Sequence, residues 1–184
     1  MAIPPERTSI METFDLLIIG AGISGINCAY RFQTWAPGAS YVVLDGRDSI
    51  GGTWDSWKYP GVRCDSNIST MTFPWHNWVF PGGLVEGRII NEYLKDAASK
   101  QRIDEHIRFR HKVLSADWFS EKQQWNLTVD YRGEQKRFSA RFLVLGTGFF
   151  DYESPLQAEI PGLDRFAGKY ILNTPRQNRL ANLD

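Results

Sequence analysis

The chain has 184 residues, of which 42% are hydrophobic and 23% charged, and its 21 basic and 21 acidic residues leave no net charge. This length suffices for one domain with a sizeable core, and the balanced charge gives no support for nucleic-acid binding. No apolar run approaches the ~20 residues of a membrane span. Two cysteines, Cys28 and Cys64, are too few for a disulfide framework, so we expect a reduced, cytoplasmic environment.

The first predicted elements form a strand, a turn, a helix and a second strand. Residues 14–19 (FDLLII) are hydrophobic enough for a strand buried on both faces. The turn GAGISG follows at 20–25, residues 26–35 are helix-compatible, and residues 41–44 (YVVL) predict another buried strand. Asp45 ends that strand, twenty residues after the last glycine. This combination is typical of a dinucleotide-binding fingerprint, the alternative being a helix-packing glycine cluster without ligand.

The residue types in this unit fit a nucleotide. Gly20 permits a tight turn, Gly22 lets a pyrophosphate approach the backbone, and Gly25 lets the helix pack against the strand. The helix N-terminus offers unpaired N–H groups to phosphate. Asp45 is expected to accept hydrogen bonds from ribose hydroxyls, and a 2′-phosphate there would meet a repulsion of roughly 4 kcal/mol at an effective dielectric constant near 20. The site therefore favours FAD or NAD over NADP, and we interpret Arg47 as a solvated residue of a charged turn.

Glycine and aromatic residues dominate the following stretch. Residues 51–54 (GGTW) offer bare backbone to a ligand and a large aromatic face. Residues 59–66 (YPGVRCDS) are rich in turn-forming residues. Residues 71–81 (MTFPWHNWVFP) contain two prolines and favour neither a helix nor a central strand. We expect them to form either a loop over the sheet edge or one wall of a cofactor or substrate cleft.

The remaining elements complete an α/β pattern. Residues 85–101 predict the clearest helix, because their apolar side chains share one face. Residues 107–109 and 112–113 fit a third strand, and residues 142–145 (FLVL) predict a buried strand that runs into the glycines of 146–148 (GTG). Three alternating stretches predict an antiparallel meander: residues 116–119, 125–129 and 136–140. The sequence therefore predicts a doubly wound, Rossmann-like FAD-binding domain with a β-meander crossover, incomplete in this chain.

The sequence gives little support for a metal site or a hydrolase active site. His76, His106 and His111 lack the spacing of metal ligands, so we expect no metal site and interpret them as surface or cleft residues. Ser24 lies inside GAGISG without a surrounding GxSxG, which argues against a hydrolase nucleophile.

Several segments together resemble the class B flavin-dependent monooxygenases, above all the Baeyer–Villiger type, with flavin-containing and N-hydroxylating monooxygenases as near relatives. The resemblance covers about residues 12–168. The segments that carry it are GAGISG at 20–25, Asp45, GGTW at 51–54, YPGVRCDS at 59–66 and FLVLGTGFF at 142–150.

The resemblance implies a set of FAD-binding residues. Asp65 matches a family acid near the isoalloxazine ring, and Val113 matches a strand residue whose backbone holds adenine. The residues implied to bind the ADP half of FAD are Gly20, Gly22, Ile23, Ser24, Gly25 and Asp45. The residues implied to lie along the flavin side are Gly52, Thr53 and Trp54. Thr147 and Gly148 match the strand end beside the cofactor.

The resemblance also implies the reaction. NADPH reduces the flavin, O₂ adds to give a flavin C4a-peroxide, and one oxygen passes to a small organic ketone, amine or sulfide. The family's second GxGxxG domain, which binds NADPH, is absent from this sequence. Residues 166–168 begin a Baeyer–Villiger fingerprint, but Leu172 and Arg176 stand at its His and Trp positions.

These features give the expected domain organisation. Residues 1–13 lack the apolar core of a signal peptide and are expected to be a disordered leader. Residues 14–150 are expected to form the FAD-binding domain, and residues 151–184 a linker toward an NADPH-binding domain that is absent. We expect FAD binding without turnover by the chain alone. The alternative is a non-catalytic or vestigial fragment that binds FAD or another nucleotide.

Overall fold

A single six-stranded sheet organises the computed structural model, which describes residues 11–151 and 159–168. The strand order is β3-β2-β1-β6-β5-β4. The strands are β1 (Glu12–Ile19), β2 (Tyr41–Leu44), β3 (Ile107–Arg108), β4 (His111–Phe119), β5 (Gln124–Tyr131) and β6 (Glu134–Leu145). The α-helices are α1 (Ile23–Trp35), α2 (Thr53–Ser56) and α3 (Gly87–Lys100), and short 3₁₀ turns cover Ile68–Thr70, Asp104–His106 and Leu163–Arg165.

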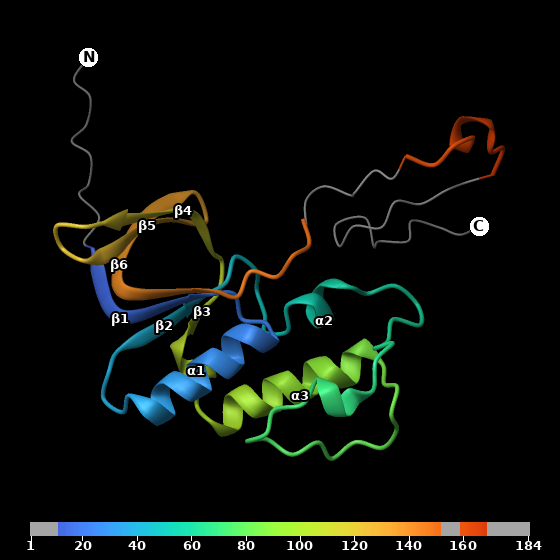
Figure 1. Ribbon diagram of the computed structural model, residues 1–184, viewed down its shortest axis with the longest axis horizontal. Coiled ribbons are helices and arrows are strands. Elements are labelled where there is room, and N and C mark those ends of the chain that lie inside the picture. Colours follow the sequence, from blue (N-terminus) through green and yellow to red (C-terminus); the bar gives the residue numbers. More distant parts are fainter. Residues whose placement is uncertain (1–10, 152–158, 169–184) are drawn as a thin grey trace.

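The parallel half of the sheet is built around β1. This strand pairs in parallel with β2 on one side and with β6 on the other. Leu17 and Ile18 are fully buried on opposite faces, as expected for a strand in the middle of a parallel sheet. Helices α1 and α3 cover one face, where Ile18 packs in a cluster with Ile26 of α1 and Leu94 of α3 (Figure 1).

An antiparallel ribbon made by β4, β5 and the first half of β6 covers the other face (Figure 1). Its apolar side chains meet those of the parallel strands in a second buried cluster, formed by Leu17, Val42, Leu44, Leu127, Val129, Phe138 and Ala140. Helices, parallel strands and antiparallel ribbon therefore make three layers. The predicted α/β, Rossmann-like fold with a β-meander is confirmed.

The predicted third strand is wrong in one respect. Residues 112–113 do not continue it, because Arg110 adopts a left-handed conformation with φ 60° and separates β3 from β4. Lys112 and Val113 instead begin β4, where they pair antiparallel with Asp130 and Val129 of β5.

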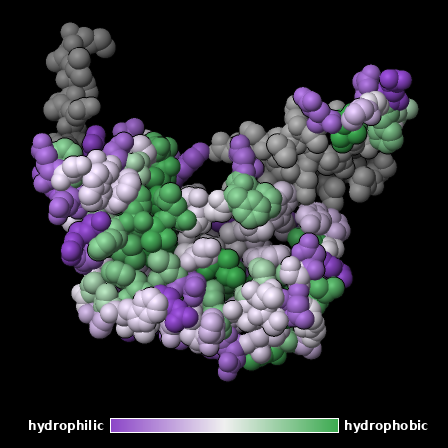
Figure 2. Space-filling view, viewed as in Figure 1, coloured by the Kyte–Doolittle hydropathy of each residue, from purple (hydrophilic) through white to green (hydrophobic). Residues whose placement is uncertain are grey.

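The strands expected at 136–140 and 142–145 are one continuous strand, β6. Its first half pairs antiparallel with β5, and from Phe138 onward it also pairs in parallel with β1. The second half is not buried as expected, since Phe142 is 57% and Leu145 67% exposed. Among the described residues, β5 stops pairing with β6 at Ala140, so only β1 flanks this half. Figure 2 shows an apolar area over these strands.

The aromatic segment 71–81 packs on the helices rather than over the sheet edge. Trp75 stacks on Tyr30 of α1 with ring centroids 4.0 Å apart, and its indole N–H donates to Asn27 at 2.9 Å. The hydroxyl of Tyr93, from α3, donates to the carbonyl of His76 and accepts from the amide of Phe73, each at 2.7 Å. The segment is therefore a structural clamp across α1 and α3.

The first strand extends beyond the expected start of the FAD-binding domain. Strand β1 begins at Glu12, inside the expected leader, because Glu12 pairs with Phe138 and binds Arg108 through two contacts of 2.7 Å. The rest of the leader up to residue 10, most of the expected linker, and both Leu172 and Arg176 lie outside the described residues. In the part of the chain that is described, no helix has the length and apolarity needed to cross a membrane.

Candidate functional site

A cleft of about 490 Å³ opens at the carboxyl ends of β1, β2 and β6. In open α/β sheets this is the edge at which ligands bind. The cleft is lined by Ile19, Gly20, Gly22, Ile23, Ser24, Leu44, Asp45, Gly46, Arg47, Gly51, Gly52, Thr53, Trp54, His111, Lys112, Val113, Gly146, Thr147, Gly148 and Phe149.

The floor of the cleft is a place where three backbone segments meet. A side chain at Gly25 would put its Cβ 1.8 Å from the carbonyl oxygen of Gly20, and one at Gly20 would lie 2.4 Å from that of Gly146. Gly20 also has a φ of 103°, which L side chains rarely adopt. Only glycine therefore lets α1, the end of β1 and the end of β6 pack this closely.

The wall of the cleft combines bare backbone with a helix terminus. Gly22 is the N-cap of α1, without a side-chain cap and without an acidic residue in the first turn. The first amides of the helix thus have no intrahelical acceptor, and the first turn itself carries no carboxylate, which is an arrangement that binds anions. A Cβ at Gly52 would lie 3.0 Å from the Cα of Gly22, so the two glycines face each other across a narrow gap.

Asp45 lies at the end of β2 and is 95% buried. One carboxylate oxygen, Oδ2, accepts from the amide of Ala21 at 2.8 Å, which ties the acid to the glycine turn. The other, Oδ1, accepts from the amide of Arg47 at the same distance. The acid expected at the ribose position is therefore fixed beside the N-terminus of α1.

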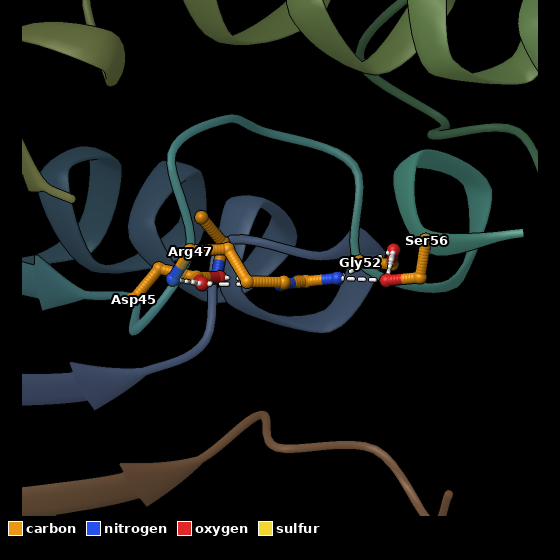
Figure 3. A network of polar contacts seen from close by, with 5 residues as sticks. Asp45, Arg47, Gly52 and Ser56 are labelled. Carbon is orange, nitrogen blue, oxygen red and sulfur yellow. Dashed lines mark hydrogen bonds and ion pairs between the residues drawn. The ribbon is translucent and has the colours of Figure 1, made fainter. Parts of the chain in front are cut away.

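Arg47 is not the solvated residue that we expected. Its guanidinium lies 3.3 Å from each oxygen of Asp45 and donates to the carbonyl of Gly52 at 2.8 Å and to the hydroxyl of Ser56 (Figure 3). The chain turns back after β2, so an arginine two residues from Asp45 reaches the glycine loop and α2. Because this positive charge adjoins Asp45, the like-charge repulsion expected against a 2′-phosphate is offset.

The strand β4 provides the opposite rim. Val113, the expected adenine contact, lines the cleft beside His111 and Lys112. His111 is 93% buried, and its Nδ1 lies 2.8 Å from the carbonyl oxygen of Phe109. Burial lowers the pKa of this imidazole below its ordinary value, which favours its neutral form.

The cleft brings together all but two of the residues expected at the cofactor. Gly25 lies beneath it, against Gly20, and Asp65 is exposed and absent from its lining. The lining also includes Gly51, from the expected glycine pair, and Lys112 and Phe149, which we did not single out. Each of them neighbours a predicted residue in sequence, which is the signal that could have found them.

Comparisons with known proteins agree with this geometry. Residues 18–80 match the model of an NAD(P)-binding Rossmann-like domain. FAD-containing monooxygenase EthA of Mycolicibacterium smegmatis is 44% identical over 160 residues, which are 87% of this chain and 32% of the relative. Probable FAD-binding monooxygenase AlmA of Acinetobacter baylyi is 35% identical over 158 residues, 85% of this chain and 32% of that protein.

Solved structures give the same result. An open crystal structure of cyclohexanone monooxygenase superposes with a TM-score of 0.72 at 26% identity, covering 84% of this chain and 30% of the other. Oxidised steroid monooxygenase bound to NADP has a TM-score of 0.68 at 30% identity, covering 85% and 29%. The chain thus spans about a third of the length of the relatives that it matches.

Fold and cleft together define a Rossmann-like dinucleotide-binding unit. Over the compared residues the chain is similar to FAD-containing monooxygenases and to cyclohexanone monooxygenase, and the resemblance stated from its motifs is confirmed.

Proposed function

We propose that the cleft binds FAD by its ADP half, and that residues 14–150 are the FAD-binding part of an NADPH- and O₂-dependent flavin monooxygenase. The observation that carries the proposal is the glycine gap between Gly22 and Gly52, which faces the uncapped N-terminus of α1 with Asp45 beside it. A Cβ in this gap would occupy the space that a pyrophosphate needs.

The residues present fit the cofactor. In the proposed complex the first amides of α1, at Ile23 and Ser24, bind the pyrophosphate, and Asp45 accepts from the ribose. The backbone of Val113 contacts adenine. The flavin side would be formed by Gly52, Thr53, Trp54, Thr147 and Gly148, which line the same cleft. Asp65 stays a candidate for the neighbourhood of the flavin ring, although it does not line the described cleft.

The proposed activity is oxygen insertion into a ketone, or oxygenation of an amine or sulfide, on a small organic substrate. When bound, FAD supplies the redox chemistry with NADPH and O₂. The residues of this chain contribute binding and orientation: the helix terminus fixes the pyrophosphate, and the glycine loop at 51–54 holds the backbone close to the ligand. Apolar lining such as Ile19, Leu44 and Val113 excludes water from the nucleotide.

The visible spectrum of the chain after incubation with FAD and desalting tests this proposal. We expect a retained flavin spectrum with FAD and none with FMN, because FMN shares the flavin ring but lacks the ADP half. A folded, colourless protein after FAD treatment would contradict the proposal. Equal retention of FMN would contradict the assignment of the cleft to the ADP half.

We also propose that the 184 residues bind FAD without turnover by themselves. Their sequence contains one GxGxxG, which in our proposal binds FAD, whereas NADPH needs a nucleotide site of its own. Anaerobic NADPH should therefore leave the spectrum of the FAD-loaded chain oxidised. Bleaching of the flavin absorption would contradict this part of the proposal and would also exclude the alternative of a non-catalytic FAD-binding module.

A further inference from the structure

Arg47 connects two parts of the cleft that belong to different elements (Figure 3). On one side it adjoins Asp45 at the end of β2, and on the other it donates to the carbonyl of Gly52 and to the hydroxyl of Ser56. Ser56 in turn donates to the same Gly52 carbonyl at 2.9 Å. The guanidinium is thus built into the loop 51–56 that forms one wall of the cleft.

The loop 51–56 needs such an anchor. Its helix α2 has four residues, too few to be stable alone, and none of them is buried. Gly51 and Gly52 have φ values of 139° and 58°, and glycine carries the largest entropic cost of ordering. The amide of Gly51 donates to the carbonyl of Ala21, and Asn91 of α3 donates to Asp55, each at 3.1 Å. A planar, multidentate donor that reaches Gly52 and Ser56 together adds an anchor on the cleft side of this short segment.

The hydrogen bonds of Asp45 fall into a short pair and a long pair. The amides of Ala21 and Arg47 lie 2.8 Å from its oxygens, whereas Nε and Nη2 of Arg47 each lie 3.3 Å away. A carboxylate has about four acceptor positions, so these four contacts fill it. A ribose hydroxyl can therefore bind Asp45 only by replacing a contact, and the long ones from the guanidinium are the weaker.

We propose that Arg47 is a positioning residue that anchors the loop 51–56 and, without ligand, hydrogen-bonds Asp45. When nucleotide binds, a ribose hydroxyl replaces the guanidinium at Asp45, and Arg47 retains its hydrogen bonds to Gly52 and Ser56. This inference rests on the proposed FAD site for its second half only. The first half concerns the protein without ligand and can be tested separately.

Hydrogen exchange of the ligand-free chain tests the anchoring. Arg47→Gln should speed exchange of the amides of residues 54–57 at least tenfold, and Ser56→Ala should have a smaller effect, while amides of β5 stay unchanged. The matched control is Arg88→Gln, because Arg88 is 69% exposed and pairs only with Glu92 within α3 among the contacts described. Unchanged exchange at 54–57 in both Arg47→Gln and Ser56→Ala would overturn the anchoring role, whether or not the chain binds FAD.

Nucleotide binding tests the exchange of partners at Asp45. The probes are ADP and 2′-deoxy-ADP, compared by calorimetry in the wild type, Arg47→Gln and Asp45→Asn. We expect the wild type to prefer ADP at least fivefold, Arg47→Gln to bind both more weakly with the preference retained, and Asp45→Asn to lose the preference. Loss of the preference in Arg47→Gln would overturn the proposal, because Arg47 itself would then contact the ribose. If the wild type binds FAD but does not prefer ADP over 2′-deoxy-ADP, the ribose does not replace Arg47 at Asp45, and this half of the proposal is overturned. If the wild type binds neither FAD nor ADP, the proposed FAD site is refuted.

Discussion

The cleft and the aromatic clamp on α1 and α3 are stabilised in opposite ways. At the cleft, glycines bring backbone against backbone, and the first amides of α1 have no capping side chain. In the clamp, the ring of Phe73 stacks on Trp75 and packs at a tilt against Tyr93, whose hydroxyl both donates and accepts. A clamp whose central hydroxyl both donates and accepts adds stability, whereas a cleft that leaves backbone donors open keeps them for a ligand. Substitutions in the two regions should therefore separate folding from binding.

The largest expected effect is at the floor of the cleft, where binding site and fold coincide. Gly25→Ala places a Cβ 1.8 Å from the Gly20 carbonyl, a clash between backbones that no rotamer relieves. We expect a loss of more than about 4 kcal/mol in the free energy of unfolding, or failure to fold. Urea denaturation measures it, and a variant with near-wild-type stability would contradict the geometry of this junction.

The next effect is in the clamp. Tyr93→Phe keeps the ring but leaves the amide of Phe73 and the carbonyl of His76 without their partner. Since an unsatisfied buried group costs about 1–3 kcal/mol, we expect about 2–4 kcal/mol lower stability. FAD affinity, measured where the variant is fully folded, should stay within twofold of wild type. A tenfold loss of affinity would show that the two regions are not independent.

A smaller effect on folding is expected in the glycine gap. Gly22 has an extended conformation, and its Cβ would lie 3.4 Å from the Cα of Gly52, an ordinary contact. Gly22→Ala should therefore fold normally but lower FAD affinity at least tenfold, about 1.4 kcal/mol, because the methyl group occupies the approach to the pyrophosphate. Fluorescence titration measures the affinity. Wild-type affinity in a folded variant would contradict the proposed position of the pyrophosphate.

The smallest effect belongs to the Glu12–Arg108 pair at the other end of β1. The hydrogen bond from Arg108 lowers the pKa of Glu12 below its ordinary value. The pair therefore stabilises the fold above pH 4.5, and this contribution is lost as the pH falls through the lowered pKa. Both side chains are partly exposed, so Arg108→Gln should cost at most about 1 kcal/mol at pH 7 and less at pH 3. An equal cost at both pH values, in denaturation curves, would contradict this account.

Local patterns predicted the elements around the cleft well where their residues are close in sequence. The first strand, the glycine turn, α1, β2 and Asp45 could be predicted, because hydrophobic runs and glycine spacing report local geometry. The apolar face of α3 was likewise confirmed through buried Ile90, Tyr93 and Leu94.

Features that depend on partners distant in sequence could not be predicted. Arg47 in GRD reads as a surface turn, and only the folded loop brings Gly52 and Ser56 to it. The continuity of β6 was missed because its pairing changes from β5 to β1 along one strand, which no local pattern encodes. The sequence of the aromatic segment 71–81 was equally compatible with a cleft wall and with a loop over the sheet edge. Ring stacking leaves no periodic pattern in a sequence, so the packing of this segment on α1 and α3 could not be predicted.

The most direct test of the central claim is the dissociation constant of FAD for the chain and for Gly22→Val. The matched control is Gly83→Val, because Gly83 lies in a loop outside the cleft and a Cβ there meets only Asn67 at 3.9 Å. The account predicts saturable binding by the wild type and by Gly83→Val, and none by folded Gly22→Val. Equal FAD affinity in all three proteins would contradict it.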